Sequence, residues 1–304
     1  MTTLRIAAAA YPLDWFEDFA AYEAKIGRWV AEAAAQGADL LVFPEYGAME
    51  LASLGGRAVA ADLEGALRES ARHRPAADAL LARLSAAHGV HILGGSGPVF
   101  AGDRPVNRAT LFCPGGVIGH QDKQIMTRFE REEWDVRAGG APVLFETPIG
   151  RIGVLICYDS EFPLLARALV EAGAEILLAP SCTETYAGFM RVRVGSMARA
   201  LEGQCAVVHA PLVGTAEWCA GVEENRGRAA IYGPPDRGWP ETGILAETAL
   251  DRPGWAIAEV SLAQIAETRA DGVVLNCRHW PEQAARPPVR VIRAAETAAP
   301  MPAG

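Results

Sequence analysis

The sequence predicts a layered α/β fold, and three observations support this expectation. Short apolar runs with the length of buried strands alternate with helical segments along the chain. No linker-like stretch interrupts the succession, and no internal repeat of fixed period occurs. The 304 residues, half of them hydrophobic, are enough for a large core. We therefore expect one domain over residues 1–293 and a disordered, Ala/Pro-rich tail over residues 294–304.

The first half of the chain predicts two helices, two strands and a hairpin. Apolar residues at helical spacing predict a helix over residues 19–33, with Gly37 as its stop. The apolar run 39–43 predicts a buried strand that leads into Pro44-Glu45. The other elements expected here are a helix over 78–88, a strand over 90–94, and a hairpin of 109–112 and 117–121 that turns at Gly115-Gly116.

The second half alternates more regularly between strands and helices. The apolar run 151–157 predicts a buried strand with a thiol at its end. Pro163 suits the first turn of the next helix, and Gly173 closes that helix. The remaining expected elements are strands over 175–179, 205–210, 229–232 and 255–260, and helices over 188–201 and 261–269.

Charge and composition exclude several classes of protein. A net charge of -9 and a pI near 5.3 argue against a nucleic-acid partner. The six cysteines form no C-x-x-C pair or Cys/His ladder, so we expect no metal, no disulfide scaffold and a reducing, cytoplasmic location. The apolar part of Met1–Tyr11 is shorter than the roughly 7–15 residues of a signal-peptide core. No run approaches the ~20 apolar residues of a membrane span.

Lysine is rare in this chain, since 26 of the 28 basic residues are arginines. A lysine that persists against this bias calls for a chemical explanation, because ammonium and guanidinium differ in size, geometry and pKa. Lys25 lies on the predicted helix 19–33, where we expect a solvated side chain. Lys123 follows the predicted hairpin, and its compact charge fits a small pocket better than a guanidinium would.

Three side chains with complementary chemistry follow the ends of three separate strand segments: Glu45, Lys123 and Cys157. Sites in α/β sheets are usually assembled at strand ends. A carboxylate can take the proton of a thiol, while an ammonium favours the thiolate and stabilises the oxyanion formed when sulfur attacks a carbonyl or nitrile carbon. Each residue alone is more often structural. Together they predict a hydrolase with a cysteine nucleophile.

Three segments resemble the signature motifs of the nitrilase superfamily, the carbon–nitrogen hydrolases. They occur in the family's order and are Phe43-Pro44-Glu45, Asp122-Lys123 and Leu155-Ile156-Cys157-Tyr158-Asp159-Ser160-Glu161-Phe162-Pro163. The similarity runs from Arg5 to about Trp280. This resemblance implies a four-layer α-β-β-α sandwich, a homodimer or larger homo-oligomer, and no cofactor.

The resemblance also implies a role for each matching residue. Glu45 would be the general base, Lys123 would stabilise the tetrahedral intermediate, and Cys157 would form a thioester with the acyl group. The backbone N–H of Tyr158 would complete the oxyanion hole. Glu130 falls where the superfamily places a second glutamate, which orients the lysine or the substrate. Alternatively, Glu130 belongs to a solvated charge run with the three residues that follow it.

The sequence leaves two substrate classes open, amides and nitriles. The residues Met126-Thr127, Glu130-Arg131 and Trp134 are similar to those of true nitrilases, whereas Tyr158-Asp159 resembles the amidase-like branches. We favour an amidase that acts on a small amide, because the residues beside the nucleophile line the acyl pocket. A nitrilase is the alternative.

The substrate-binding candidates are Thr183 and Arg191. The latter, with Arg193 and Arg199, would either bind a substrate carboxylate or belong to a cationic helix face paired with surface acids. Two hypotheses compete with the Glu-Lys-Cys set. One is a conventional cysteine–histidine pair that uses His209, and the other is a non-catalytic binding or scaffold module on the same fold.

Overall fold

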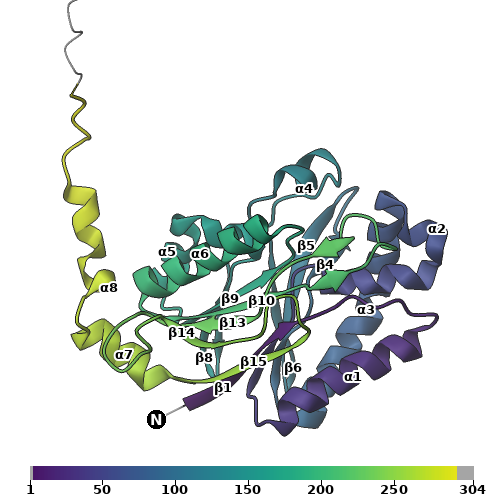
Figure 1. The fold of residues 1–304 in the computed structure, drawn as a ribbon, viewed down its shortest axis with the longest axis horizontal. Coiled ribbons are helices and arrows are strands. Elements are labelled where there is room, and N and C mark those ends of the chain that lie inside the picture. The colour runs from purple at the N-terminus through teal and green to yellow at the C-terminus, as the bar shows by residue number, and fades with distance from the viewer. Residues whose placement is uncertain (1–2, 293–304) are drawn as a thin grey trace, which may run out of the picture.

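The computed structural model describes residues 3–292 and shows two β-sheets packed face to face between two layers of helices (Figure 1). The first sheet has seven strands, in the order β15-β1-β2-β3-β5-β4, with β6 paired to β5. The second sheet has six strands, in the order β14-β13-β10-β9-β8-β7. The four-layer α-β-β-α sandwich is therefore confirmed.

The strands of the two large sheets have the following bounds. The first sheet contains β1 (Thr3–Ala10), β2 (Leu40–Val42), β3 (His91–Leu93), β4 (Gly97–Phe100), β5 (Pro105–Cys113), β6 (Gly116–Asp122) and β15 (Gly254–Ser261). The second contains β7 (Leu144–Thr147), β8 (Gly150–Val154), β9 (Ile176–Ser181), β10 (Ala206–Pro211), β13 (Ala230–Tyr232) and β14 (Ile244–Glu247). A separate small ribbon pairs β11 (Gly214–Thr215) with β12 (Glu224–Asn225).

The helices cover the outer faces of the sheets. The α-helices are α1 (Phe19–Ala35), α2 (Arg57–Ala60), α3 (Leu63–His88), α4 (Arg128–Glu132), α5 (Pro163–Glu171), α6 (Tyr186–Gly203), α7 (Leu262–Asp271) and α8 (Asn276–His279). Three 3₁₀ segments are η1 (Gly47–Gly55), η2 (Cys157–Glu161) and η3 (Trp280–Ala285). Figure 1 shows α1 and α3 on one outer side of the sandwich and α5 and α6 on the other.

The buried hydrophobic residues form three cores. Successive side chains of a strand point into different cores, as expected for strands buried on both faces. Ile6 of β1 packs in the core between the sheets, together with Leu178 of β9. The neighbouring Ala7 points instead into the core beneath α1 and α3. Leu177 of β9 packs on the opposite face, with Leu169 of α5. The two sheets therefore hold each other's strand ends at fixed positions.

The predicted elements recur in the structure with shifted ends, and two differences have clear causes. The sequence does not predict β1, because its run of alanines lacks the β-branched and aromatic residues typical of strands. Pairing with β2 on one side and β15 on the other holds this strand in place. Helix α3 begins at Leu63 rather than at residue 78, capped by the Asp62 carboxylate, which accepts the Gly65 N–H at 2.7 Å. Charged residues and Pro75 obscure the apolar pattern there.

The C-terminal tail, membrane spans and cysteines are also the subject of sequence-based expectations. The tail predicted over residues 294–304 lies outside the described residues. Within residues 3–292, no helix combines the length and the apolar character needed to cross a membrane. All six cysteines are free thiols.

Lys25 is buried, so the expectation of a solvated side chain is wrong. Only 2% of the residue is exposed. Its Nζ donates to the Pro12 carbonyl at 2.6 Å and to Glu50 Oε1 at 2.5 Å, and it lies 2.9 Å from Asp14 Oδ2. Burial raises the pKa of Glu50 to about 7, while the Lys25 charge opposes this rise. Helical spacing alone could not reveal this partner, because it lies 25 residues along the chain in η1.

We expect Lys25→Met to lower the free energy of unfolding by about 3–5 kcal/mol, because the buried Glu50 carboxylate would lose its cation. Urea denaturation followed by circular dichroism measures this loss. The double variant Lys25→Met/Glu50→Gln is the control and should recover part of the stability. A loss below about 1 kcal/mol in the single variant would show that the pair contributes no more than a surface ion pair.

Candidate active site

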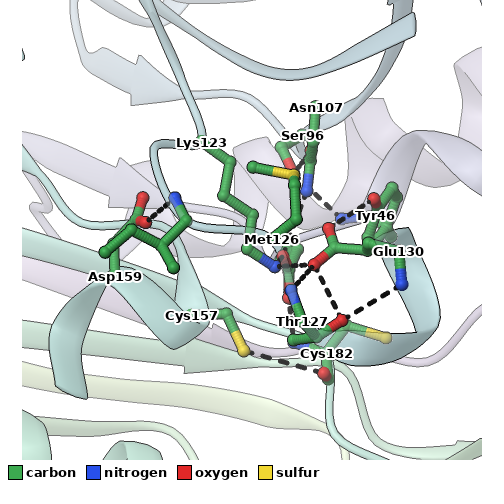
Figure 2. Close-up of polar contacts among 12 residues, drawn as sticks. Tyr46, Ser96, Asn107, Lys123, Met126, Thr127, Glu130, Cys157, Asp159 and Cys182 are labelled. Atoms are coloured by element: carbon green, nitrogen blue, oxygen red, sulfur yellow. Dashed lines mark hydrogen bonds and ion pairs between the residues drawn. The ribbon is translucent and has the colours of Figure 1, made fainter. Parts of the chain in front are cut away.

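The predicted site residues line one cavity of about 790 Å³. Figure 2 shows Lys123 pointing toward Glu130, with Cys157 and Cys182 beside it. The structure thus brings together side chains that are far apart in the sequence. The predicted residues that line the cavity are Glu45, Lys123, Glu130, Cys157, Tyr158, Thr183 and Arg191.

Strand ends of both sheets position the three central residues. Glu45 lies shortly after β2, and Lys123 directly follows β6, so both come from the first sheet. Cys157 follows β8 of the second sheet. The strand expected over 151–157 ends at Val154, and the thiol lies beyond it, as the first residue of η2. The site therefore forms where the two sheets meet.

Lys123 is fully buried between two carboxylates. Its Nζ donates to Glu45 Oε1 at 2.7 Å and to Glu130 Oε2 at 2.6 Å. Burial alone would lower the pKa of Lys123, but the charges of Glu130 and Glu45 outweigh burial and raise this pKa well above its usual value. The side chain is therefore a permanent ammonium.

The Glu45 carboxylate is held by the backbone and by an amide as well as by Lys123. Asn107 Nδ2 donates to Oε1 at 3.0 Å, and the Cys182 N–H donates to Oε2 at 2.9 Å. Burial raises the pKa of Glu45 to about 7, although the Lys123 charge opposes this rise. A carboxyl group with a pKa near neutrality can both take and return a proton.

Glu130 is a second buried carboxylate, and it is held by its own helix. Thr127 and Glu130 form a capping box at the start of α4, in which the Thr127 N–H donates to Glu130 Oε2 at 2.9 Å. The Tyr46 hydroxyl donates to Oε1 at 2.7 Å. The Lys123 charge and these hydrogen bonds outweigh burial and lower the pKa of Glu130. Glu130 is 2% exposed while the next three residues are exposed, so it does not belong to a solvated charge run.

Cys157 starts the tight turn η2 with an uncommon backbone conformation. Its φ of 49° lies in the left-handed region, which a residue with a Cβ adopts only when its surroundings enforce it. The Ser160 hydroxyl donates to the Cys157 carbonyl at 2.6 Å, and the Cys157 Sγ lies 3.7 Å from the Cys182 carbonyl. Burial and then the Glu45 charge raise the pKa of the Cys157 thiol well above its usual value, against the effect of Lys123. The sulfur therefore keeps its proton at rest.

The three arginines of α6 occupy different environments. Arg191 lines the cavity, but its side chain is 63% exposed and its Nε lies 3.5 Å from Glu161 Oε1. Arg193 pairs with a surface glutamate outside the cavity lining. Arg199 is buried and donates to the Ser160 carbonyl at 3.1 Å. Arg199 also pairs with Glu202 at 3.0 Å, so all three arginines pair with acids, as expected for the cationic helix face, although Arg199 is buried.

The other predicted residues have simpler surroundings. Thr183 lines the cavity, and its hydroxyl already donates to the Arg226 carbonyl at 2.9 Å. The Tyr158 ring packs edge-on against Phe162, with ring centroids 4.8 Å apart. His209 contacts Ser181 at 2.9 Å instead of the thiol, does not line the cavity, and has its pKa lowered by burial to about 3. A Cys157–His209 pair is therefore excluded.

Sequence reasoning does not identify the residues that support Glu45. Ser96 Oγ donates to Asn107 Oδ1 at 2.7 Å and accepts the Tyr46 N–H at 3.0 Å, so these residues fix the amide that holds Glu45. Ser96 lies in a glycine-rich stretch that only partly resembles a serine-hydrolase motif. No sequence signal connects Asn107 with Glu45, because 62 residues separate them.

Comparisons with known proteins identify the family of the chain. The family model "Carbon-nitrogen hydrolase" matches residues 5–270. The chain is 31% identical over 272 residues to the "Probable hydrolase YhcX" of Bacillus subtilis, a match that covers 89% of this chain and 52% of that protein. It is 36% identical over 126 residues to the deaminated glutathione amidase of Bos taurus, covering 40% and 34% of the two chains. The chain spans about half or less of these relatives' lengths.

A solved structure supports the fold. The crystal structure of Saccharomyces cerevisiae Nit3, a member of branch 10 of the nitrilase superfamily, superposes with a TM-score of 0.69 over 88% of this chain and 93% of Nit3. Their sequences are 21% identical, so this likeness concerns the fold alone. Because the family model matches most of the chain, the protein belongs to the carbon–nitrogen hydrolase family.

Proposed function

We propose that the protein hydrolyses a small amide through a thioester on Cys157. The observation that carries this proposal is the buried Lys123 ammonium, hydrogen-bonded to Glu45 and Glu130 in the same cavity as the thiol. A non-catalytic scaffold would have no need to keep two carboxylates, an ammonium and a thiol out of water at one place, because burying such groups is costly.

In the first half of the reaction, sulfur attacks the amide carbon while Glu45 takes the thiol proton. The high pKa of the Cys157 thiol means that proton transfer accompanies the attack rather than preceding it. The negative charge moves to the carbonyl oxygen. There the Lys123 ammonium and the backbone N–H of Tyr158 stabilise it.

The second half releases both products and restores the site. Protonated Glu45 gives its proton to the departing nitrogen, so the C–N bond breaks, ammonia or an amine leaves, and the acyl group stays on sulfur. A water molecule then attacks the thioester while Glu45 takes its proton. The C–S bond breaks, the carboxylic acid leaves, and the proton returns to Cys157. No step requires a cofactor.

Glu130 has a supporting role in this proposal. It accepts from Lys123, Tyr46 and Thr127, so both of its oxygens are held by hydrogen bonds. Its lowered pKa keeps it anionic near neutral pH. Glu130 therefore fixes the ammonium, while Glu45, with a pKa of about 7, exchanges protons.

The charged residues that line the cavity indicate which acyl groups the site can accept. The Lys123 ammonium is already paired with two carboxylates, and Arg191 is paired with Glu161. Three further glutamates line the cavity: Glu184, Glu223 and Glu224. We therefore propose that Arg191 and Thr183 contact the substrate as polar wall residues, and that Arg191 is not a carboxylate clamp. Neutral acyl groups are the suitable probes.

We expect amides to be hydrolysed faster than nitriles of the same acyl group, because protonated Glu45 is placed to return a proton to the amide nitrogen. A nitrile forms a thioimidate that must be hydrated before ammonia leaves. Ammonia release from matched neutral amide and nitrile pairs measures this preference, with Cys157→Ala as the inactive control. A kcat/KM for nitriles above that for amides across several acyl groups would favour a nitrilase instead.

Replacing Lys123 by arginine should be nearly as damaging as replacing it by alanine. A planar guanidinium cannot lie between the two carboxylates in the place of the ammonium. We expect kcat to fall on the order of 10²-fold or more, the loss typical of a removed oxyanion donor. Arg128→Lys, an exchange of the same two residue types at an exposed site on α4, should leave kcat unchanged. Near-normal turnover of Lys123→Arg would mean that the site needs only positive charge.

We also propose a homodimer or larger homo-oligomer in the cytoplasm. Exposed apolar side chains on the outer helix layer support self-association, namely Leu164 of α5 and Val194 and Leu201 of α6. Sedimentation equilibrium should give at least twice the 32.3 kDa mass of one chain. A monomer mass at every protein concentration would contradict this expectation.

A further inference from the structure

Asp159 is a fully buried carboxylate that the mechanism above does not use. Its exposed fraction is 0%, and within residues 3–292 no cationic side chain lies within 4.0 Å of it. Its oxygens accept two backbone N–H groups, from Gln124 at 3.1 Å and from Ile125 at 2.8 Å. Burial raises the pKa of Asp159 to about 6 despite these hydrogen bonds. Burying an unpaired carboxylate is costly, so its position calls for an explanation.

The two bonds connect the nucleophile turn with the segment that carries Lys123. Asp159 lies two residues after Cys157 in η2, and its partners are the two residues directly after Lys123. Figure 2 shows the Asp159 carboxylate bonded to this backbone on the side of the site opposite Glu130. Hydrogen bonds from N–H groups to a carboxylate are shorter and stronger than those between neutral groups.

Other contacts hold each segment separately. Arg199 of α6 fastens the nucleophile turn to that helix by donating to the Ser160 carbonyl, and the Ser160 hydroxyl donates to the Cys157 carbonyl within the turn. The Lys123 backbone is bonded to Asn107 and Gly139. Within residues 3–292, every hydrogen bond between η2 and residues 123–127 ends on Asp159.

We propose that Asp159 is a positioning residue that sets the place of the Lys123 ammonium relative to the Cys157 sulfur. This proposal rests on the function proposed above for those two residues. Asp159 does not line the cavity, so it acts through its neighbours and does not touch the substrate. A displacement of roughly 1 Å in such a set can lower the rate by about 10²-fold.

Asp159→Asn tests the proposal, because asparagine has nearly the same shape but turns an NH₂ group toward one of the two donors. The rate of Cys157 alkylation by iodoacetamide at fixed pH reports the thiolate fraction without any substrate. Removing a nearby negative charge would by itself increase that fraction. Moving Lys123 away would decrease it, because the Lys123 charge lowers the pKa of Cys157. The two explanations therefore predict opposite signs.

We expect Asp159→Asn to slow alkylation roughly tenfold, equivalent to a rise of about one unit in the thiol pKa. In a Lys123→Ala background the same substitution should cause little further slowing, because the residue through which it acts is gone. A general collapse of the turn would slow both backgrounds equally. An unchanged or faster alkylation in the single variant would overturn the proposal, and so would equal slowing in both backgrounds.

Two controls keep the test decisive. Asp39→Asn removes a carboxylate that accepts the Arg5 N–H at 2.8 Å far from the cavity, and it should leave alkylation unchanged. If Asp159→Asn does not fold, Asp159→Glu replaces it, because the added methylene group displaces the Lys123 segment while the charge is kept. Alkylation at the wild-type rate in a folded Asp159→Glu variant would then contradict the proposal.

Turnover separates this inference from the proposed function. We expect Asp159→Asn to lower kcat about 10²-fold with KM changed less than about threefold. Turnover that survives Cys157→Ala would refute the thioester mechanism. If Cys157→Ala is inactive but Asp159→Asn keeps kcat within about twofold of wild type, only the positioning role fails.

Discussion

The ammonium of Lys123, held out of water between Glu45 and Glu130, is the interaction on which the site depends. Two carboxyl groups share one cation, so the cluster carries one more negative charge than positive when both acids are ionised. The two acids respond differently to that excess. Glu130, with bonds from Tyr46 and Thr127, keeps a lowered pKa, whereas burial raises the pKa of Glu45 to about 7. One environment thus produces a fixed anion and a titrating acid–base group.

The packing of the two sheets brings together residues that follow strands of different sheets, and no local sequence pattern encodes this packing. Glu45 and Lys123 follow strands of the first sheet, while Cys157 follows a strand of the second. The core between the sheets fixes their relative position. Direct hydrogen bonds then join the two sides, from the Cys182 N–H to Glu45 and from the backbone after Lys123 to Asp159. In the proposed reaction, the buried thiol with its raised pKa gives up its proton as a substrate carbonyl accepts the negative charge.

Short motifs made Glu45, Lys123 and Cys157 predictable, because each combines a reactive side chain with a strand end. Supporting residues were not predictable in the same way. Asn107 and Ser96 act through contacts between segments far apart in the chain, which no local pattern encodes. The same limit explains the error at Lys25, whose buried partner lies outside its helix. The sequence does not predict strand β1, because its alanines have a low strand propensity. Pairing with β2 and β15 keeps them extended.

The central claim is that an acyl group is carried on one particular thiol in a site that contains two, Cys157 and Cys182. Rapid acid quenching during turnover of a neutral amide, followed by intact-mass and peptide mass spectrometry, tests this claim most directly. The account predicts a mass increase equal to the acyl group, located on Cys157 and removed by hydroxylamine. An acyl group on Cys182, or turnover by Cys157→Ala, would contradict it.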